Sequence, residues 1–219
     1  MVEVFPSELQ KKIESAGVIA VVVIEDADKA VPLAEALLRG GINAMELTLR
    51  TDAALKAVEH IAYHVPDMVV GCGTVLSRAQ LDAVIHAGAY FAVSPGLNPR
   101  VLQHAIEKKF PFAPGISTAT DIEIAQEMGC RILKFFPCET SGGLKHLKVL
   151  SAPFQHLGLK YIPLGGINPG NLPEYLGDRN LIAAVGGSWL APKKLIAEGD
   201  WAGIEKLAKE ALEIVNAGN

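Results

Sequence analysis

Short apolar runs alternate with longer amphipathic segments along the whole chain. The runs are rich in Val, Ile, Leu and Phe and lie at 18–24, 44–49, 68–75, 91–94, 112–116, 131–136, 161–164 and 181–186. Between them, segments such as 27–38, 53–64, 78–87 and 99–108 repeat apolar residues every three or four positions, which is the period of a helix. Alternating strands and helices predict an α/β fold with a parallel sheet and right-handed crossovers.

About eight strand–helix units in 219 residues favour one compact (β/α)8 TIM barrel over an open doubly wound sheet. We therefore expect residues 1–219 to form a single barrel domain, with an extra N-terminal helix over 8–15 and a last outer helix over 201–215. Residues that can cap free N–H groups stand near several predicted helix starts. They are Asp52, Ser77, Asn98, Thr118 and Asn168.

The predicted strand over 44–50 carries charge on one of its two faces. Side chains alternate along a strand, so Glu46 and Arg50 share a face with Thr48, while Met45 and Leu47 share the other. An edge strand with one wet face would explain this pattern. In a barrel both faces are covered, so the charged face would look into the interior, where an unpaired carboxylate is costly. Glu46 is therefore a candidate for chemistry.

The predicted strand over 131–137 places Lys134 between Leu133 and Phe135 in a strongly apolar stretch. One interpretation is a structural partner for a buried acid. The other is a reactive amine that burial and a nearby cation such as Arg50 keep partly uncharged, so that it can attack a carbonyl group. A strand lysine beside an interior carboxylate suits imine chemistry.

Glycine clusters follow the last two predicted strands. Gly165 and Gly166 follow the seventh strand, and Gly186, Gly187 and Ser188 follow the eighth. The loops at these positions frequently form the phosphate site of such barrels. Glycine lets backbone N–H groups approach an anion closely, and a serine adds a hydroxyl donor.

Composition narrows the classes of partner. Twenty Lys and Arg against 24 Asp and Glu give a net charge of −4, and half of the residues are hydrophobic. The chain can therefore bury a core, has no basic footprint for nucleic acid, and has no apolar run long enough to span a membrane. The start at Met1–Glu3 lacks the apolar stretch of a secretory signal, which predicts a cytoplasmic protein. Cys72, Cys130 and Cys138 show no metal-binding or disulfide spacing, so reduced thiols are expected.

Six segments together resemble the bacterial 2-keto-3-deoxy-6-phosphogluconate aldolases, which often also act on 4-hydroxy-2-oxoglutarate. The segments are Glu46-Leu-Thr-Leu-Arg-Thr51, Gly71-Cys-Gly-Thr-Val-Leu76, Ser94-Pro-Gly96, Pro114-Gly-Ile-Ser-Thr118, Lys134-Phe-Phe-Pro137 and Gly186-Gly-Ser-Trp-Leu190. The resemblance runs in order over nearly the whole chain. It implies a class I aldolase on a barrel, usually a homotrimer, that uses no metal ion or other cofactor and cleaves its substrate to pyruvate and glyceraldehyde 3-phosphate.

The resemblance also implies a role for each matching residue. Lys134 resembles the Schiff-base lysine and Glu46 the carboxylate that transfers protons. Arg50 and Thr74 resemble the groups that hold the pyruvate carboxylate, with Pro95 and Phe136 lining that pocket; Gly165, Gly166, Gly187 and Ser188 resemble the phosphate end.

Two other functions remain open from the sequence, and one position departs from the family. The chain could be a phosphosugar isomerase or epimerase, in which Lys134 only pairs with an acid, or a metabolite-binding barrel without turnover. Where the family often reads Pro-Thr-Gly-Gly, this chain reads Pro163-Leu-Gly-Gly166. If Leu164 faces the substrate, a hydroxyl near its middle carbons is missing; if it faces the helices, it packs in the core.

Overall fold

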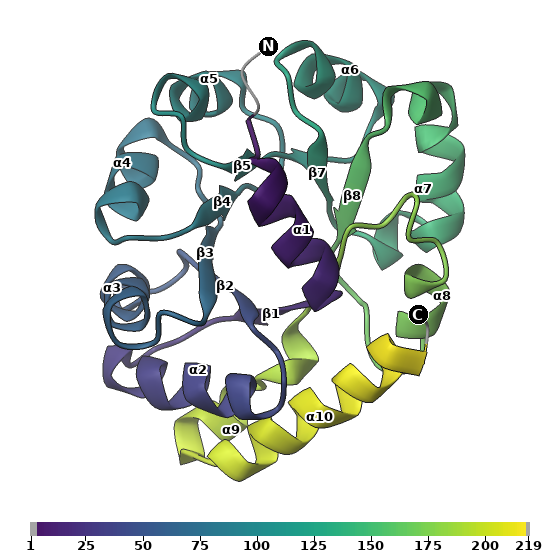
Figure 1. The fold of residues 1–219 in the computed structure, drawn as a ribbon. Coiled ribbons are helices and arrows are strands. Elements are labelled where there is room, and N and C mark those ends of the chain that lie inside the picture. The colour runs from purple at the N-terminus through teal and green to yellow at the C-terminus, as the bar shows by residue number, and fades with distance from the viewer. Residues whose placement is uncertain (1–3, 218–219) are drawn as a thin grey trace.

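The computed structural model describes residues 4–217 as parallel strands with helices outside them (Figure 1). The strands are β1 (Val18–Val22), β2 (Ala44–Thr48), β3 (Val69–Gly73), β4 (Phe91–Val93), β5 (Phe112–Ala113), β6 (Gly115–Ile116), β7 (Ile132–Phe135), β8 (Lys160–Pro163) and β9 (Val185–Gly187). They form a six-stranded sheet in the order β5-β4-β3-β2-β1-β9 and a three-stranded sheet in the order β6-β7-β8. The alternating sequence pattern thus predicts the α/β class and the parallel strands correctly.

The two sheets approach each other at both ends. β5 and β6 are separated only by Pro114, whose missing N–H interrupts the run that the sequence predicts as one strand over 112–116. On the other side, parallel bridges join Tyr161 to Ile182 and Leu164 to Gly186, which places β8 beside β9. The strand predicted over 181–186 is therefore shorter than expected and begins at Val185.

The helices follow the predicted segments closely. They are α1 (Ser7–Ala16), α2 (Ala30–Arg39), α3 (Ala54–His64), α4 (Arg78–His86), α5 (Pro99–Glu107), α6 (Ala119–Glu127), α7 (Gly143–Ser151), α8 (Leu172–Leu176), α9 (Lys193–Glu198) and α10 (Trp201–Ala217). Short 3-10 helices add η1 (Ala27–Lys29), η2 (Glu139–Ser141), η3 (Ala152–Leu157) and η4 (Ser188–Leu190). The segment predicted as one helix over 27–38 begins with η1, where Asp26 accepts a bond from the backbone N–H of Asp28.

Three of the five expected caps are confirmed. The side chains of Ser77, Asn98 and Thr118 accept backbone N–H groups at the starts of α4, α5 and α6. The expectation for Asp52 is wrong, because α3 begins after an alanine with no side-chain cap. The expectation for Asn168 is also wrong: its side chain accepts the N–H of Gly170 in the turn before α8.

Two hydrophobic clusters lie on opposite sides of the strands. The larger one lies between the strands and the surrounding helices. The smaller one, here called the inner cluster, contains Phe5, Leu9, Ile13, Ile19, Ala44, Val69, Phe91, Val93, Ala113, Ile132, Ile162, Leu164, Ala183 and Ala184. Three of these belong to α1 or its approach, and Figure 1 shows α1 lying across the strands. α1 therefore covers the inner cluster at the amino ends of the strands.

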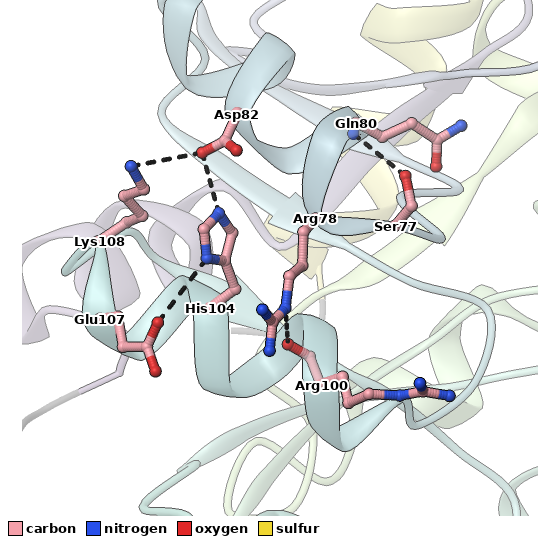
Figure 2. Close-up of polar contacts among 8 residues, drawn as sticks. All are labelled: Ser77, Arg78, Gln80, Asp82, Arg100, His104, Glu107 and Lys108. Carbon is pink, nitrogen blue, oxygen red and sulfur yellow. Dashed lines mark hydrogen bonds and ion pairs between the residues drawn. The ribbon is translucent and has the colours of Figure 1, made fainter.

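Helices α4 and α5 are joined by a surface ion-pair network (Figure 2). His104 Nε2 lies 2.9 Å from Asp82 Oδ1, and Lys108 Nζ lies 3.5 Å from the same oxygen. The hydrogen bond with His104, followed by the charges of His104 and Lys108, lowers the pKa of Asp82. Arg78 Nε also donates to the backbone oxygen of Arg100 at 3.4 Å. These contacts fix two neighbouring helices at the surface, away from the cavity described below.

Three further predictions concern the cysteines, membrane-spanning helices and the start of the chain. Cys72, Cys130 and Cys138 are buried free cysteines, as expected. Within residues 4–217, no helix is long and apolar enough to cross a membrane. Met1–Glu3, the start of the segment that predicts the absence of a secretory signal, lies outside the described residues.

Candidate active site

A cavity of about 160 Å³ collects most of the predicted site residues near the carboxyl ends of the strands. It is lined by Val21, Val23, Glu46, Thr48, Arg50, Lys134, Phe136, Leu164, Gly165, Gly166, Ile167, Gly186 and Ser188. A larger cavity of about 460 Å³ lies between α7, η3 and β8 and contains none of the predicted residues. The chemistry therefore concentrates in the smaller cavity.

Lys134 and Glu46 form a buried ion pair at the floor of this cavity. Lys134 Nζ lies 3.0 Å from Glu46 Oε1, and the residues are only 5% and 3% exposed. Strand alternation places both inside, because Ile132 and Ala44 on the same faces belong to the inner cluster. Gly73 of the neighbouring β3 makes room, since a Cβ there would lie 1.8 Å from Glu46 Oε1.

The 3.0 Å contact is short enough for a proton to pass directly between the two side chains. Moving two charges out of water is costly, and an unpaired partner would cost about 3–5 kcal/mol. A proton passed from the lysine to the carboxylate would leave a neutral amine and a neutral acid, which removes both buried charges. The neutral amine is the form that attacks a carbonyl carbon.

Phe136 forms an apolar wall next to the amine. Lys134 Nζ lies 5.5 Å from the centroid of the Phe136 ring, within the range of a cation–π contact. The ring faces the cavity because Phe136 lies two residues after Lys134 and thus on the same face of the chain. It excludes water from one side of the amine.

Arg50 brings a cation to the cavity from the loop after β2. Its Nε donates to Thr74 Oγ1 at 3.4 Å, which leaves the terminal guanidinium nitrogens free for another acceptor. Thr74 directly follows β3 and has φ of 62°, a left-handed conformation that a threonine adopts only under local constraint. Thr74 itself does not line the cavity, so the structure places it behind Arg50.

The turn Gly165–Gly166 presents backbone groups to the cavity. Both glycines have left-handed φ values, 100° and 86°. The backbone N–H of Cys138 donates to Leu164 O at 2.8 Å, and that of Glu139 donates to Gly165 O at 3.0 Å. In a trans peptide the C=O and the following N–H point in opposite directions, so the N–H groups of Gly165 and Gly166 point away from these donors. Successive backbone N–H groups in such left-handed turns can form concavities that bind anions.

Only one of the three remaining predicted site residues lines the cavity. Ser188 lines the cavity. Gly187 does not, because it packs under the ring of Trp189, which a Cβ would approach to 1.7 Å. Pro95 does not line it either and packs against Gly115, the register partner of Lys134. The structure thus brings Ser188 to the glycine turn and leaves Gly187 and Pro95 outside the cavity walls.

Leu164 directly follows β8 and lines the cavity. It is 4% exposed, belongs to the inner cluster, and fills the space over Gly186, where a Cβ would lie 2.3 Å from its Cγ. Of the two positions left open by the sequence, the one facing the substrate cavity is therefore confirmed. The Leu164 side chain packs in the inner cluster and not in the larger cluster between the strands and the helices.

The sequence did not identify several residues at this site. Thr48 lies on the same strand face as Glu46, so the period-two pattern contained a signal for it. Asn168 and Asn171 each donate a side-chain amide to Gly166 O at 3.3 Å, which fixes a third carbonyl of the glycine turn. Ordinary loop residues of this kind carry no motif that would distinguish them from turn formers.

Residues 9–207 match the family described as KDPG and KHG aldolase. The KHG/KDPG aldolase of Escherichia coli (strain K12) is 43% identical over 196 residues, which cover 90% of this chain and 91% of that protein.

Solved structures of aldolases are also similar to this chain. The 2-keto-3-deoxy-6-phosphogluconate aldolase of Zymomonas mobilis ZM4, solved with 3-phosphoglycerate, superimposes with a TM-score of 0.84 at 42% identity and covers 92% of this chain and 95% of that one. The KDPG aldolase of Legionella pneumophila, with pyruvate captured as a covalent carbinolamine intermediate, gives a TM-score of 0.86 at 39% identity over 91% and 96%.

Proposed function

The chain belongs to the KDPG and KHG aldolase family, and we propose that Lys134 and Glu46 carry out its chemistry. The protein is a class I aldolase that cleaves 2-keto-3-deoxy-6-phosphogluconate through a Schiff base. The products are pyruvate and glyceraldehyde 3-phosphate. We propose that 4-hydroxy-2-oxoglutarate, which would give pyruvate and glyoxylate, is a second substrate of the same site.

The observation that supports these roles is the buried contact of 3.0 Å between the Lys134 amine and the Glu46 carboxylate. After passing its proton to Glu46, Lys134 adds to the C2 carbonyl of the substrate and forms a carbinolamine. Glu46 gives the proton it received to the carbinolamine hydroxyl, which leaves as water. This step forms a protonated imine and restores the Glu46 carboxylate. The positive nitrogen then serves as the electron sink for the next step.

Glu46 handles the protons of the cleavage step. As the carboxylate, directly or through a water, it removes the proton from the C4 hydroxyl while the C3–C4 bond breaks. The electron pair of that bond moves into the imine and gives an enamine, and the aldehyde leaves. Glu46 then returns a proton to the enamine carbon, and water hydrolyses the imine to pyruvate and free Lys134. Such a positioned acid–base group contributes about 10² to 10⁴ in rate.

The remaining residues bind the two ends of the substrate. We propose that Arg50, oriented by Thr74, holds the carboxylate next to the reacting carbon, with Phe136 and Pro95 shaping that side. The backbone of Gly165 and Gly166, with the Ser188 hydroxyl, forms the phosphate end, and Gly187 precedes Ser188 outside the cavity walls. A forked guanidinium suits a carboxylate, and converging N–H groups suit a phosphate.

Trapping with borohydride tests the assignment. Incubation with pyruvate and borohydride should add a reduced pyruvyl group to Lys134, measurable by mass spectrometry of the digested protein. Lys134→Ala should abolish the adduct. Lys160→Ala is the matched control, because Lys160 also pairs with a glutamate, Glu14 at 2.9 Å, at the amino end of β8.

The outcome separates the candidate functions. An isomerase, an epimerase or a binding barrel would give no adduct, because none of them forms an imine with pyruvate. An adduct that persists in Lys134→Ala at another lysine, such as Lys108 or Lys145, would overturn the role of Lys134.

We also propose that the two sheets form one eight-stranded (β/α)8 barrel, a single domain over residues 1–219 with α1 as its extra N-terminal helix. The bridges between β8 and β9 and the single residue between β5 and β6 support closure of the ring. The homotrimer and the cytoplasmic location stay predictions from the family resemblance and the sequence.

A further inference from the structure

A chain of three polar side chains lies behind the glycine turn that lines the cavity. Tyr175 of α8 is 1% exposed, and its hydroxyl donates to Glu139 Oε1. Cys138 Sγ lies 3.1 Å from the same hydroxyl. A tyrosine has one O–H proton, so when it is donated to Glu139 the Cys138 thiol is the donor to the tyrosine oxygen. Burial, followed by the contacts with Cys138 and Glu139, raises the pKa of Tyr175, which keeps the hydroxyl protonated.

The backbone leaves room for this contact. A Cβ on Gly143 would lie 2.9 Å from Glu139 Oε1 and 3.3 Å from the Tyr175 hydroxyl, so a larger residue there would push against both groups. None of the three polar side chains is among those lining the cavity. Any effect of these three side chains on the cavity must therefore pass through a residue that lines it.

That link is the glycine turn itself. The backbone N–H groups of Cys138 and Glu139 hold the carbonyls of Leu164 and Gly165, as described above. Glu139 also packs against Gly166, where a Cβ would lie 2.6 Å from Glu139 Cβ. Tyr175 thus anchors the side chain of the residue whose backbone sets the direction of the Gly166 N–H group.

We propose that Tyr175 and Glu139 are positioning residues that hold the Gly165–Gly166 turn in the shape that receives the substrate's phosphate. The proposal rests on the function given above, since it assigns a supporting structure to the phosphate end of that site. Because the anchored carbonyls direct the N–H groups, a loosened anchor misaligns donors to the phosphate and leaves the Lys134 end unchanged.

Two substrates of different length give the test. 2-Keto-3-deoxy-6-phosphogluconate reaches the turn with its phosphate, whereas 4-hydroxy-2-oxoglutarate has no phosphate. Tyr175→Phe removes only the hydroxyl. We expect KM for the phosphorylated substrate to rise about three- to tenfold, the range of a lost hydrogen bond, while kcat stays within twofold. Both constants for 4-hydroxy-2-oxoglutarate should stay within twofold.

Tyr161→Phe is the matched control. Tyr161 is also 1% exposed, and within the described residues its hydroxyl has no hydrogen-bond partner. The same chemical change is therefore made in an equally buried tyrosine that does not contact Glu139. KM for the phosphorylated substrate should stay at the parental value in this variant.

Glu139→Ala provides a second variant, because Glu139 lies in an exposed segment and its replacement leaves the core intact. It should raise the same KM by a similar factor. Combined with Tyr175→Phe, it should add little, because both changes break one anchor. Additive rises, equal rises on both substrates, or an unchanged KM for the phosphorylated substrate would each overturn the proposal. Failure of the proposed function is seen separately, as a missing pyruvate adduct at Lys134 in the parent.

Discussion

The two ends of the cavity differ in the chemical groups that form them: side chains at one end and backbone groups at the other. At the amine end, Lys134 and Glu46 are side chains in the middle of β7 and β2, both nearly inaccessible to solvent and paired at 3.0 Å. At the other end, the Gly165–Gly166 turn offers backbone N–H groups, and its shape depends on bonds to Cys138 and Glu139 from behind. One end is therefore determined by residue type and the other by the path of the backbone.

Substrate length can distinguish these two ends. Damage to the amine end should affect every 2-keto acid substrate, because all of them form the same imine. Damage to the glycine turn should affect only substrates that carry a phosphate.

Glu46→Gln keeps the shape of the side chain and removes the base. Exchange of the pyruvate methyl protons with deuterated water should slow by about 10² to 10⁴, the usual contribution of a general base. Imine trapping at Lys134 should persist in part, because the amine remains. Proton NMR measures the exchange rate.

Glu205→Gln is the control for this change, because Glu205 pairs with Arg39 and Lys209 at the surface. Its exchange rate should equal that of the parent. Parental exchange in Glu46→Gln would mean that another group moves the proton.

Arg50→Ala should weaken binding of the shared carboxylate. Hydrogen bonds to a charged group contribute about 1.5–3 kcal/mol, so KM should rise by roughly 10- to 100-fold for both substrates alike. Arg50→Lys keeps the charge but loses the forked donors, and it should give an intermediate value. Steady-state kinetics on both substrates check this, and a loss confined to the phosphorylated substrate would move Arg50 to the other end of the cavity.

Gly166→Ala should damage the phosphate end selectively. With φ of 86° and a Cβ 2.6 Å from Glu139 Cβ, an alanine there is both strained and crowded. A left-handed alanine costs about 1–3 kcal/mol, and the turn would shift to relieve it. KM for the phosphorylated substrate should rise about tenfold, with little change for 4-hydroxy-2-oxoglutarate.

Gly177→Ala serves as its control, because Gly177 has φ of −66° and a Cβ there would make ordinary contacts at 3.5 Å. Its kinetic constants should match those of the parent. Equal damage to both substrates in Gly166→Ala would show that the turn supports the whole cavity.

How far the sequence could predict this site follows the same division. The alternation of strand residues, together with the predicted barrel, placed Glu46 and Lys134 on interior faces, because side-chain direction in a strand is fixed by position. It could not show that Gly187 packs under Trp189 and, unlike Ser188 and the glycine turn, does not line the cavity. The direction of the backbone in this loop depends on hydrogen bonds from Cys138 and Glu139, which are distant in the sequence, so no local sequence pattern predicts it.

The fold shows the same limits. Apolar runs located the strands, but Pro114 divides one of them into β5 and β6, since the run of apolar residues continues across a residue that cannot donate to the ladder. The contact between Tyr175 and Glu139 spans 36 positions, and neither residue stands in a recognisable motif. Long-range side-chain contacts of this kind become visible only when the chain is folded.

Leu164 lies between the two ends and should give the smallest effect. Its side chain lines the cavity and packs over Gly186, so shortening it removes interior contacts whatever replaces it. Leu164→Thr and Leu164→Val have nearly the same shape and differ by one hydroxyl group. Comparing these two variants with each other cancels the shared packing loss, which a comparison with the parent would not do.

We expect Leu164→Thr to exceed Leu164→Val in kcat/KM on 2-keto-3-deoxy-6-phosphogluconate by about two- to tenfold, the contribution of one neutral hydrogen bond. The parent should discriminate poorly between the C4 epimers, because no hydroxyl at this position recognises the substrate's middle carbons, and the Thr variant should prefer one of them. On 4-hydroxy-2-oxoglutarate the two variants should be equal, since that substrate ends before the additional hydroxyls. The three substrates to compare are the two C4 epimers of the phosphorylated substrate and 4-hydroxy-2-oxoglutarate. Equal kcat/KM values of the Thr and Val variants on all three would show that Leu164 only packs the interior. Selectivity along the sugar chain would then be set at the two ends of the cavity alone.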